Sequence, residues 1–158
     1  MRILTMLKNK INFDNICNII PDWTWNELKV GLEKSIISNS QIISYAVLVL
    51  SEDIDQFDSV LELSISKEDG VEEILFNLAT KEEKYDLKMI NSKWIFAIIY
   101  DEYSYLNDEI YDVIEDVYTE FEYPKEISNL IGYMPCDDSR SMNEKLNEYI
   151  NISRNVWC

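Results

Sequence analysis

Glycine and proline, the residues that break helices and shape tight turns, are scarce in this chain. Each occurs three times in 158 residues. A sandwich of many short strands needs such residues at its turns, so their scarcity disfavours an all-β fold. Apolar residues recur instead at helical spacing, separated by short polar segments. We therefore expect an all-α fold, arranged as an irregular multi-helix bundle or as a stack of antiparallel helix pairs.

The helical spacing is clearest in residues 71–79, where Val71, Ile74, Leu75 and Leu78 follow the i, i+3, i+4, i+7 pattern. Two stretches, Ile42–Leu50 and the segment WIFAIIY at 94–100, are so apolar and β-branched that a buried strand is the competing interpretation. Residues 82–100 are expected to form one long helix or two abutting ones. The full set of predicted helices spans residues 23–37, 42–50, 54–65, 71–79, 82–100, 107–122, a helix from 124 that closes near Gly132 and Pro135, and 141–157.

The length and the apolar content, 47% of residues, are sufficient for one hydrophobic core. We expect a single helical domain over residues 1–158, in which residues 1–20 remain unassigned. The cysteines Cys17, Cys136 and Cys158 are odd in number and widely spaced, which indicates neither a disulfide framework nor a metal site. No signal peptide or membrane-spanning run is visible, so the predicted location is cytoplasmic.

The chain is strongly acidic, with 30 Asp and Glu against 14 Lys and Arg and a formal charge of -16. Like-charge repulsion argues against nucleic acid, anionic membranes and acidic substrates as partners. A basic protein is the natural complement of such a surface.

Catalytic motifs are not evident. Histidine is absent, which removes the commonest general base and most zinc sites. Gly31, Gly70 and Gly132 are too far apart for a phosphate-binding loop. The segment DDSRSMNE at 137–144 lacks the central glycine of a calcium loop. We therefore predict no enzyme activity, no metal and no cofactor.

One helix concentrates the negative charge. On a helical wheel of residues 107–122, apolar side chains form one arc and carboxylates fill the rest, and no Lys or Arg occurs between Lys93 and Lys125. Like-charged pairs such as Asp112/Asp116 each destabilise the helix by roughly 0.2–0.5 kcal/mol. An ordinary solvated face is one interpretation, and a docking surface for a basic partner is the other. The predicted partner-binding residues are Tyr103, Tyr105, Asp108, Tyr111, Asp112, Glu115, Asp116, Tyr118 and Glu120.

Several of these segments resemble a family of small bacterial α-helical proteins of unknown function that occurs among polymorphic toxin immunity proteins. The strongest similarity is the acidic segment DEIYDVIEDVYTEFEYP followed by KEISNLIGYMP, and weaker ones are WNELKVGLEK, ISYAVLVL and KWIFAIIY. The resemblance covers about Trp25 to Tyr149. It implies an all-α fold and a role in neutralising a cognate toxin, and it supplies no catalytic residues.

Three hypotheses about function follow. The first is an immunity protein that binds a cognate basic toxin domain, plausibly a nuclease, in competition between bacteria. The second is a helical adaptor or regulatory protein that binds a basic peptide or helix. The third is a carboxylate-dependent enzyme, which the absence of histidine and of motifs disfavours. Whether the chain is a monomer or a homodimer is left open.

Overall fold

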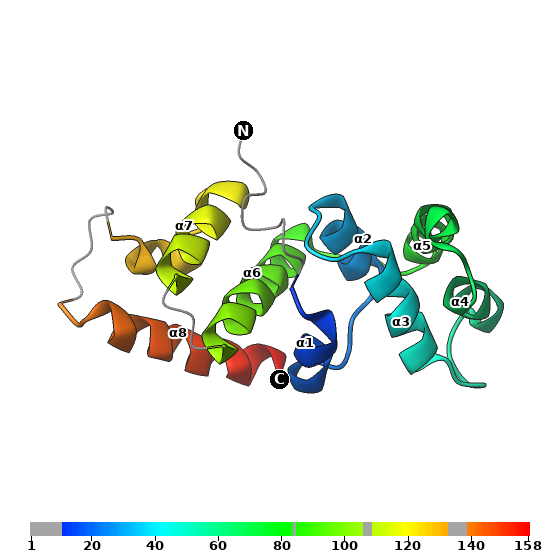
Figure 1. Ribbon diagram of the computed structural model, residues 1–158, viewed down its shortest axis with the longest axis horizontal. Coiled ribbons are helices and arrows are strands. Elements are labelled where there is room, and N and C mark those ends of the chain that lie inside the picture. Colours follow the sequence, from blue (N-terminus) through cyan, green and yellow to red (C-terminus); the bar gives the residue numbers. More distant parts are fainter. Residues whose placement is uncertain (1–10, 84, 106–108, 133–138) are drawn as a thin grey trace.

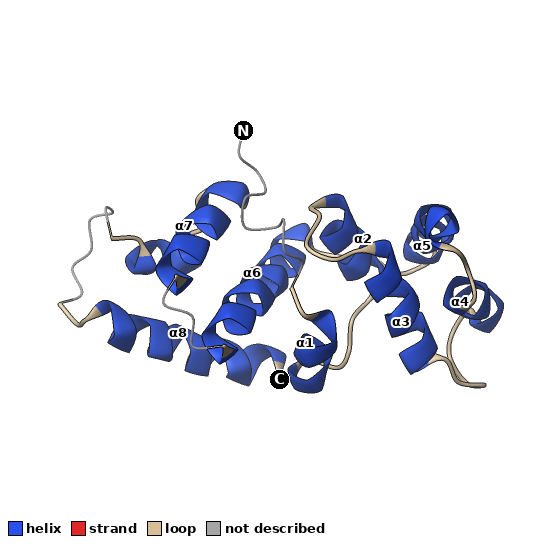
Figure 2. Cartoon of the chain, viewed as in Figure 1, coloured by secondary structure: helices blue, strands red, loops and turns tan. Residues whose placement is uncertain are grey.

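The computed structural model describes residues 11–83, 85–105, 109–132 and 139–158. Within these ranges the chain forms helices and no strand (Figure 2). The all-α prediction is confirmed. The α-helices are α1 (Phe13–Ile19), α2 (Trp25–Glu33), α3 (Asn39–Val49), α4 (Phe57–Ser64), α5 (Val71–Thr80), α6 (Leu87–Ser104), α7 (Ile110–Glu120) and α8 (Met142–Trp157), and the 3₁₀-helices are η2 (Glu68–Gly70) and η3 (Lys125–Leu130).

Helix α6 lies in the middle of an elongated molecule (Figure 1). On one side α2, α3, α4 and α5 pack on one another, and on the other side η3 packs against both α7 and α8. Helix α6 contacts α1, α2, α7 and α8, and therefore joins the two groups. Its segment Trp94–Ile99 is apolar and buried all round, which is why part of a central helix could be mistaken for a buried strand. The strand alternatives for α3 and α6 are wrong.

An aromatic cluster forms the centre of the core. The rings of Trp23 and Trp94 lie 4.4 Å apart, and Phe13 packs 5.3 Å from Trp23. The hydroxyl of Tyr45 donates to the carbonyl of Trp23 and accepts from its backbone N–H. Phe13 comes from α1, so the segment that the sequence left unassigned contains a helix that contributes to the core.

Helix α2 begins with two independent caps. Thr24 and Glu27 form a capping box, in which each side chain accepts from the backbone N–H of the other residue. The carboxylate of Glu82 then accepts from the backbone N–H groups of Trp25 and Asn26, each at 2.8 Å. These contacts engage Glu82, and α6 begins at Leu87 with Asp86 as its cap. The predicted start of this helix at residue 82 is therefore wrong.

Other predicted boundaries also move inward. Helix α2 ends at Glu33 instead of residue 37, because Ser35 adopts a left-handed conformation (φ 61°) that lets the N–H of Ile36 donate to the carbonyl of Gly31 at 2.8 Å. The segment after Pro124 forms the 3₁₀-helix η3 instead of an α-helix, and the predicted end of that helix reaches residues outside the described ranges. The same holds for residues 107 and 108 of the predicted acidic helix.

Candidate functional site

The acidic face of α7 consists of Asp112, Glu115, Asp116 and Glu120. Opposite this face, Ile114 and Val117 are buried against the core, and α7 packs on α6 and η3. The side chain of Asp112 is exposed and the other three are partly exposed. Helix α7 contains no basic residue. A cation from elsewhere, Lys34, places its Nζ 4.8 Å above the ring of Phe121 at the end of α7. The predicted site residue Asp108 lies outside the described residues.

The predicted tyrosines make contacts within the chain. The hydroxyls of Tyr103 and Tyr111 donate to the side chains of Asn147 and Asn143, at 2.9 and 2.5 Å. These asparagines are one helical turn apart on α8, so the two tyrosines tie α6 and α7 to α8. Partial burial raises the pKa of Tyr111. The hydroxyl of Tyr105, a well-exposed residue, accepts from the side-chain amides of Asn12 and Asn15.

The structure places Tyr118 in the core, with 5% of its surface exposed. It lies at the edge of the apolar arc of α7, and the ring of Tyr123 packs edge-on against it at 5.4 Å. Tyr123 itself is exposed, so the tyrosine that a partner could reach at this end of α7 is one that the sequence did not single out.

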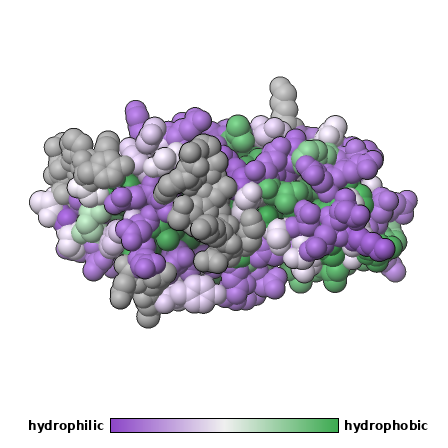
Figure 3. Space-filling model, turned by 45° about the horizontal axis from the view of Figure 1, so that its top comes forward, coloured by the Kyte–Doolittle hydropathy of each residue, from purple (hydrophilic) through white to green (hydrophobic). Residues whose placement is uncertain are grey.

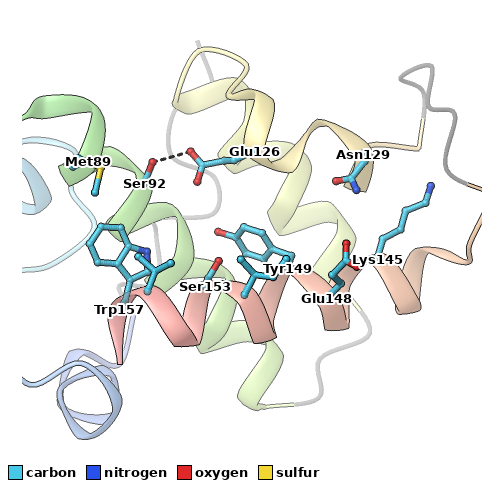
Figure 4. A pocket seen from close by; sticks show the side chains of 11 residues that line it. Met89, Ser92, Glu126, Asn129, Lys145, Glu148, Tyr149, Ser153 and Trp157 are labelled. Atoms are coloured by element: carbon cyan, nitrogen blue, oxygen red, sulfur yellow. Dashed lines mark hydrogen bonds between the residues drawn. The ribbon is translucent and has the colours of Figure 1, made fainter.

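A cleft of about 360 Å³ opens between α6, η3 and α8 (Figure 4). Met89, Ile152 and Val156 line it, and each is 49–59% exposed. The hydroxyl of Ser92 donates to Glu126 at 2.9 Å across one end (Figure 4). Lys145 and Glu148 line the opposite end, and Glu148 accepts two hydrogen bonds from Arg140. No window of the sequence predicts this cleft, because its walls come from three separate elements.

Tyr149 projects into this cleft from α8 (Figure 4). Its hydroxyl oxygen is buried and makes no hydrogen bond of ordinary geometry with the described residues. Burial raises the pKa of Tyr149, and the negative charge of Glu126 raises it further, while a contact with Ser153 acts in the opposite direction. The phenol therefore remains protonated and retains its capacity to donate and accept hydrogen bonds.

A second cleft, of about 630 Å³, shares Ser92 and Glu126 with the first. It lies towards α7 and is lined by Phe121, Lys88 and Lys125. Lys88 and Lys125 are exposed, so this cleft carries positive charge on a chain whose net charge is negative.

The described residues include few candidates for a metal site or for a reactive nucleophile. No group of three or more Cys, Asp or Glu side chains there is placed to hold a metal ion. Burial, and secondarily the charge of Asp14, raises the pKa of Cys17 to about 12, so its thiol stays protonated. Among the described helices, none combines the length and the apolar character needed to cross a membrane.

The surface in Figure 3 is mostly hydrophilic, with apolar side chains gathered towards the end that contains α3, α4 and α5. A protein-family model described as "Uncharacterized protein conserved in bacteria (DUF2247)" matches residues 13–154. The match begins at the first residue of α1 and runs into the last turn of α8. No curated protein and no solved structure matches the chain.

Proposed function

We propose that this chain, which belongs to the bacterial family DUF2247, is an immunity protein that binds and neutralises a cognate basic toxin domain inside the cell. The observation that carries the proposal is the acidic face of α7. It exposes carboxylates of Asp112, Glu115, Asp116 and Glu120 on one helix that has no basic residue of its own.

Such a face is unfavourable for the isolated helix. Asp112/Asp116 and Asp116/Glu120 are like-charged i, i+4 pairs, and each raises the free energy of the helix by roughly 0.2–0.5 kcal/mol. Burial of Ile114 and Val117 offsets this penalty, because each fully buried side chain of this size contributes about 1.5–3 kcal/mol. A surface that needed only solubility could carry interspersed lysines. A partner that supplies the cations explains why this one does not.

A nuclease toxin fits the required chemistry. Its active-site cleft must be electropositive to hold phosphates, so an acidic protein surface can compete with the nucleic acid for it. Complementary charge accelerates the encounter, and aromatic side chains close to the charges supply apolar contact area. Tyr105 and Tyr123 are exposed tyrosines that precede and follow α7 along the chain.

Co-expression with the toxin domain encoded beside the gene tests this proposal. We expect a 1:1 complex whose affinity falls as salt is raised. The variant Asp112→Lys/Asp116→Lys should weaken the complex by about tenfold or more, since close charge pairs across interfaces contribute more than 1.4 kcal/mol. Glu52→Lys/Asp53→Lys is the matched control, because it makes the same change of charge in an exposed turn after α3. Equal binding by both variants would contradict the assignment of the face.

The adaptor hypothesis remains the second candidate, because the cleft beside α8 has the exposed apolar walls that receive peptide side chains. The two functions differ in their genetic setting. A neighbouring gene for a large secreted protein with a variable C-terminal domain supports immunity, and a regulator or enzyme operon supports the adaptor.

A further inference from the structure

We propose that the cleft between α6, η3 and α8 binds an arginine side chain that projects from the protein partner. The inference rests on the proposed function only in taking that partner to be a basic protein. It concerns a different surface from the acidic face of α7.

The first requirement of an arginine site is an available carboxylate, and Glu126 supplies it. One oxygen of Glu126 accepts from the hydroxyl of Ser92 at 2.9 Å, which fixes the carboxylate at the end of the cleft (Figure 4). Glu126 forms no ion pair with the described residues. The other carboxylate of the cleft, Glu148, is already held by Arg140 through two hydrogen bonds of 2.8 and 3.0 Å.

The second requirement is a hydrogen-bond acceptor beside that carboxylate. The buried hydroxyl oxygen of Tyr149 makes no hydrogen bond of ordinary geometry with the described residues, although a contact with Ser153 lowers its pKa while the charge of Glu126 raises it. A buried hydroxyl without a well-formed hydrogen bond is unfavourable, so a donor that enters the cleft and reaches it gains free energy. A guanidinium carries several N–H donors in one plane and can reach a carboxylate and a phenol at the same time.

The third requirement is an apolar wall for the methylene stem. Met89, Ile152 and Val156 provide it, and they remain about half exposed in the free chain. Long cationic side chains pack their stems on such surfaces while the charged end stays at a polar group. A purely apolar occupant would cover these walls but leave the charge of Glu126 without a cation and Tyr149 without a new donor. Lysine is the poorer occupant, because its strongly hydrated ammonium lacks the planar fork.

The chemistry of the partner follows from the charge of the chain. With a net charge of -16, the surface attracts cationic proteins over several ångströms before contact. Arginine is also among the residues that most often dominate the binding energy of protein interfaces. The cleft would therefore bind one arginine side chain that contributes strongly to the affinity of the partner.

A titration with a small probe tests the cleft without the partner. The probe is N-acetyl-L-arginine N-methylamide, and its uncharged isostere N-acetyl-L-citrulline N-methylamide is the control. We expect saturable NMR shifts of the Met89, Ile152 and Val156 methyl groups with the arginine compound and at least fivefold weaker binding of the citrulline compound. Linear shifts spread over the acidic surface, or equal binding of both compounds, would overturn the proposal.

Two substitutions make the assignment specific. Glu126→Gln and Tyr149→Phe should each weaken binding of the arginine probe. Glu62→Gln, on the exposed face of α4, should leave that binding unchanged. Tyr149→Phe should leave the melting temperature unchanged or raise it, because the lost hydroxyl makes no hydrogen bond of ordinary geometry with the described residues. A loss of stability in Tyr149→Phe would mean that a bound water or Ser153 already satisfies the hydroxyl, and would count against the arginine site.

The complex with the toxin domain separates this inference from the proposed function. Glu126→Gln should reduce the affinity of that complex by about tenfold, as expected for an interfacial charge pair. A complex that forms but is indifferent to Glu126→Gln and Tyr149→Phe would end the arginine proposal and leave immunity standing. A cleft that binds the arginine probe, in a chain that binds no toxin domain, would end the immunity proposal and leave the site standing.

Discussion

Gly31 of α2 lies so close to Trp94 of α6 that a Cβ atom at position 31 would be 2.4 Å from Cζ2 of the indole. Trp94 is fully buried, and its Nε1 donates to the carbonyl of Glu27 at 2.7 Å. The ring of Trp23 packs against the ring of Trp94, with 4.4 Å between the ring centroids. The indole of Trp94 is therefore confined, and α2 and α6 can approach this closely because Gly31 has no side chain.

Gly31→Ala is expected to lower the free energy of unfolding by about 1–3 kcal/mol, because an extra methyl group in a filled core forces side chains or backbone to shift. This loss exceeds the gain in helix propensity, which is about 1 kcal/mol or less. Gly132→Ala is the control, since no atom lies within 4 Å of a Cβ atom there. Urea denaturation of both variants measures the difference. Equal stabilities would show that Trp94 can move.

Lys93→Met is expected to destabilise the fold by about 3 kcal/mol, because it leaves the partly buried carboxylate of Glu27 without its cation. The Nζ of Lys93 donates to Glu27 and to the carbonyl of Asp22, at 2.8 and 2.7 Å, and lies 4.3 Å from the ring of Trp23. Glu27→Gln keeps an acceptor for the capping box. The double variant Lys93→Met/Glu27→Gln should recover part of the loss in a thermal or urea cycle. Strict additivity would mean that the two side chains are not coupled.

Asp101 should make the fold less stable as pH rises. Burial raises the pKa of Asp101, the charge of Glu102 adds to this, and the N–H of Asn12 opposes it. The folded chain therefore binds this proton more tightly than the unfolded one, whose carboxyl titrates near 3.8. The stabilisation is complete below that pH and is lost as pH rises through the folded pKa. Asp101→Asn should remove this contribution, so urea unfolding from pH 4 to 7 should show its relative stability increasing. A constant difference would contradict the assignment.

Glu122→Gly is expected to stabilise the chain. Glu122 follows the end of α7 with φ 60°, and the next residue, Tyr123, has φ 62°. A left-handed conformation costs a residue with a Cβ atom about 1–2 kcal/mol, and glycine avoids this penalty. Glu122→Ala retains the penalty while also removing the charge, so the glycine variant should melt higher than the alanine variant. The reverse order would show that the turn rearranges.

The sequence predicts those helices in which the spacing of apolar residues and the capping residues lie within the helix itself. Helix α5 and helix α8 follow from amphipathic spacing, and Ser141 with Glu144 marks the start of α8 as a capping box. Helix α1 was missed, although Phe13 and Ile16 are spaced for one buried face and Asn12 caps it. Seven residues are too few to carry a clear period, so α1 depends on the aromatic core that it joins.

The candidate sites differ in the same respect: a site on a single helix can be predicted from the sequence, and a site built from several elements cannot. The acidic face of α7 can be located on a helical wheel, because all its members share one helix. The burial of Tyr118 is not evident on that wheel, because this residue lies at the edge of the apolar arc and packs against Tyr123 beyond the end of the helix. The arginine cleft brings together Ser92, Glu126 and Tyr149 from three elements. Their meeting is a product of tertiary packing and leaves no local pattern.

The carboxylate that completes the start of α2 comes from Glu82, 57 positions further along the chain than the backbone N–H of Trp25 that it receives. A ribosome delivers the N-terminal end first, so during synthesis α2 emerges with its first amide groups facing water. They find their acceptor only after α5 and the turn beyond it have followed. The start of α2 is therefore completed only once the chain has been made as far as Glu82, so its last hydrogen bonds depend on a residue that follows α5.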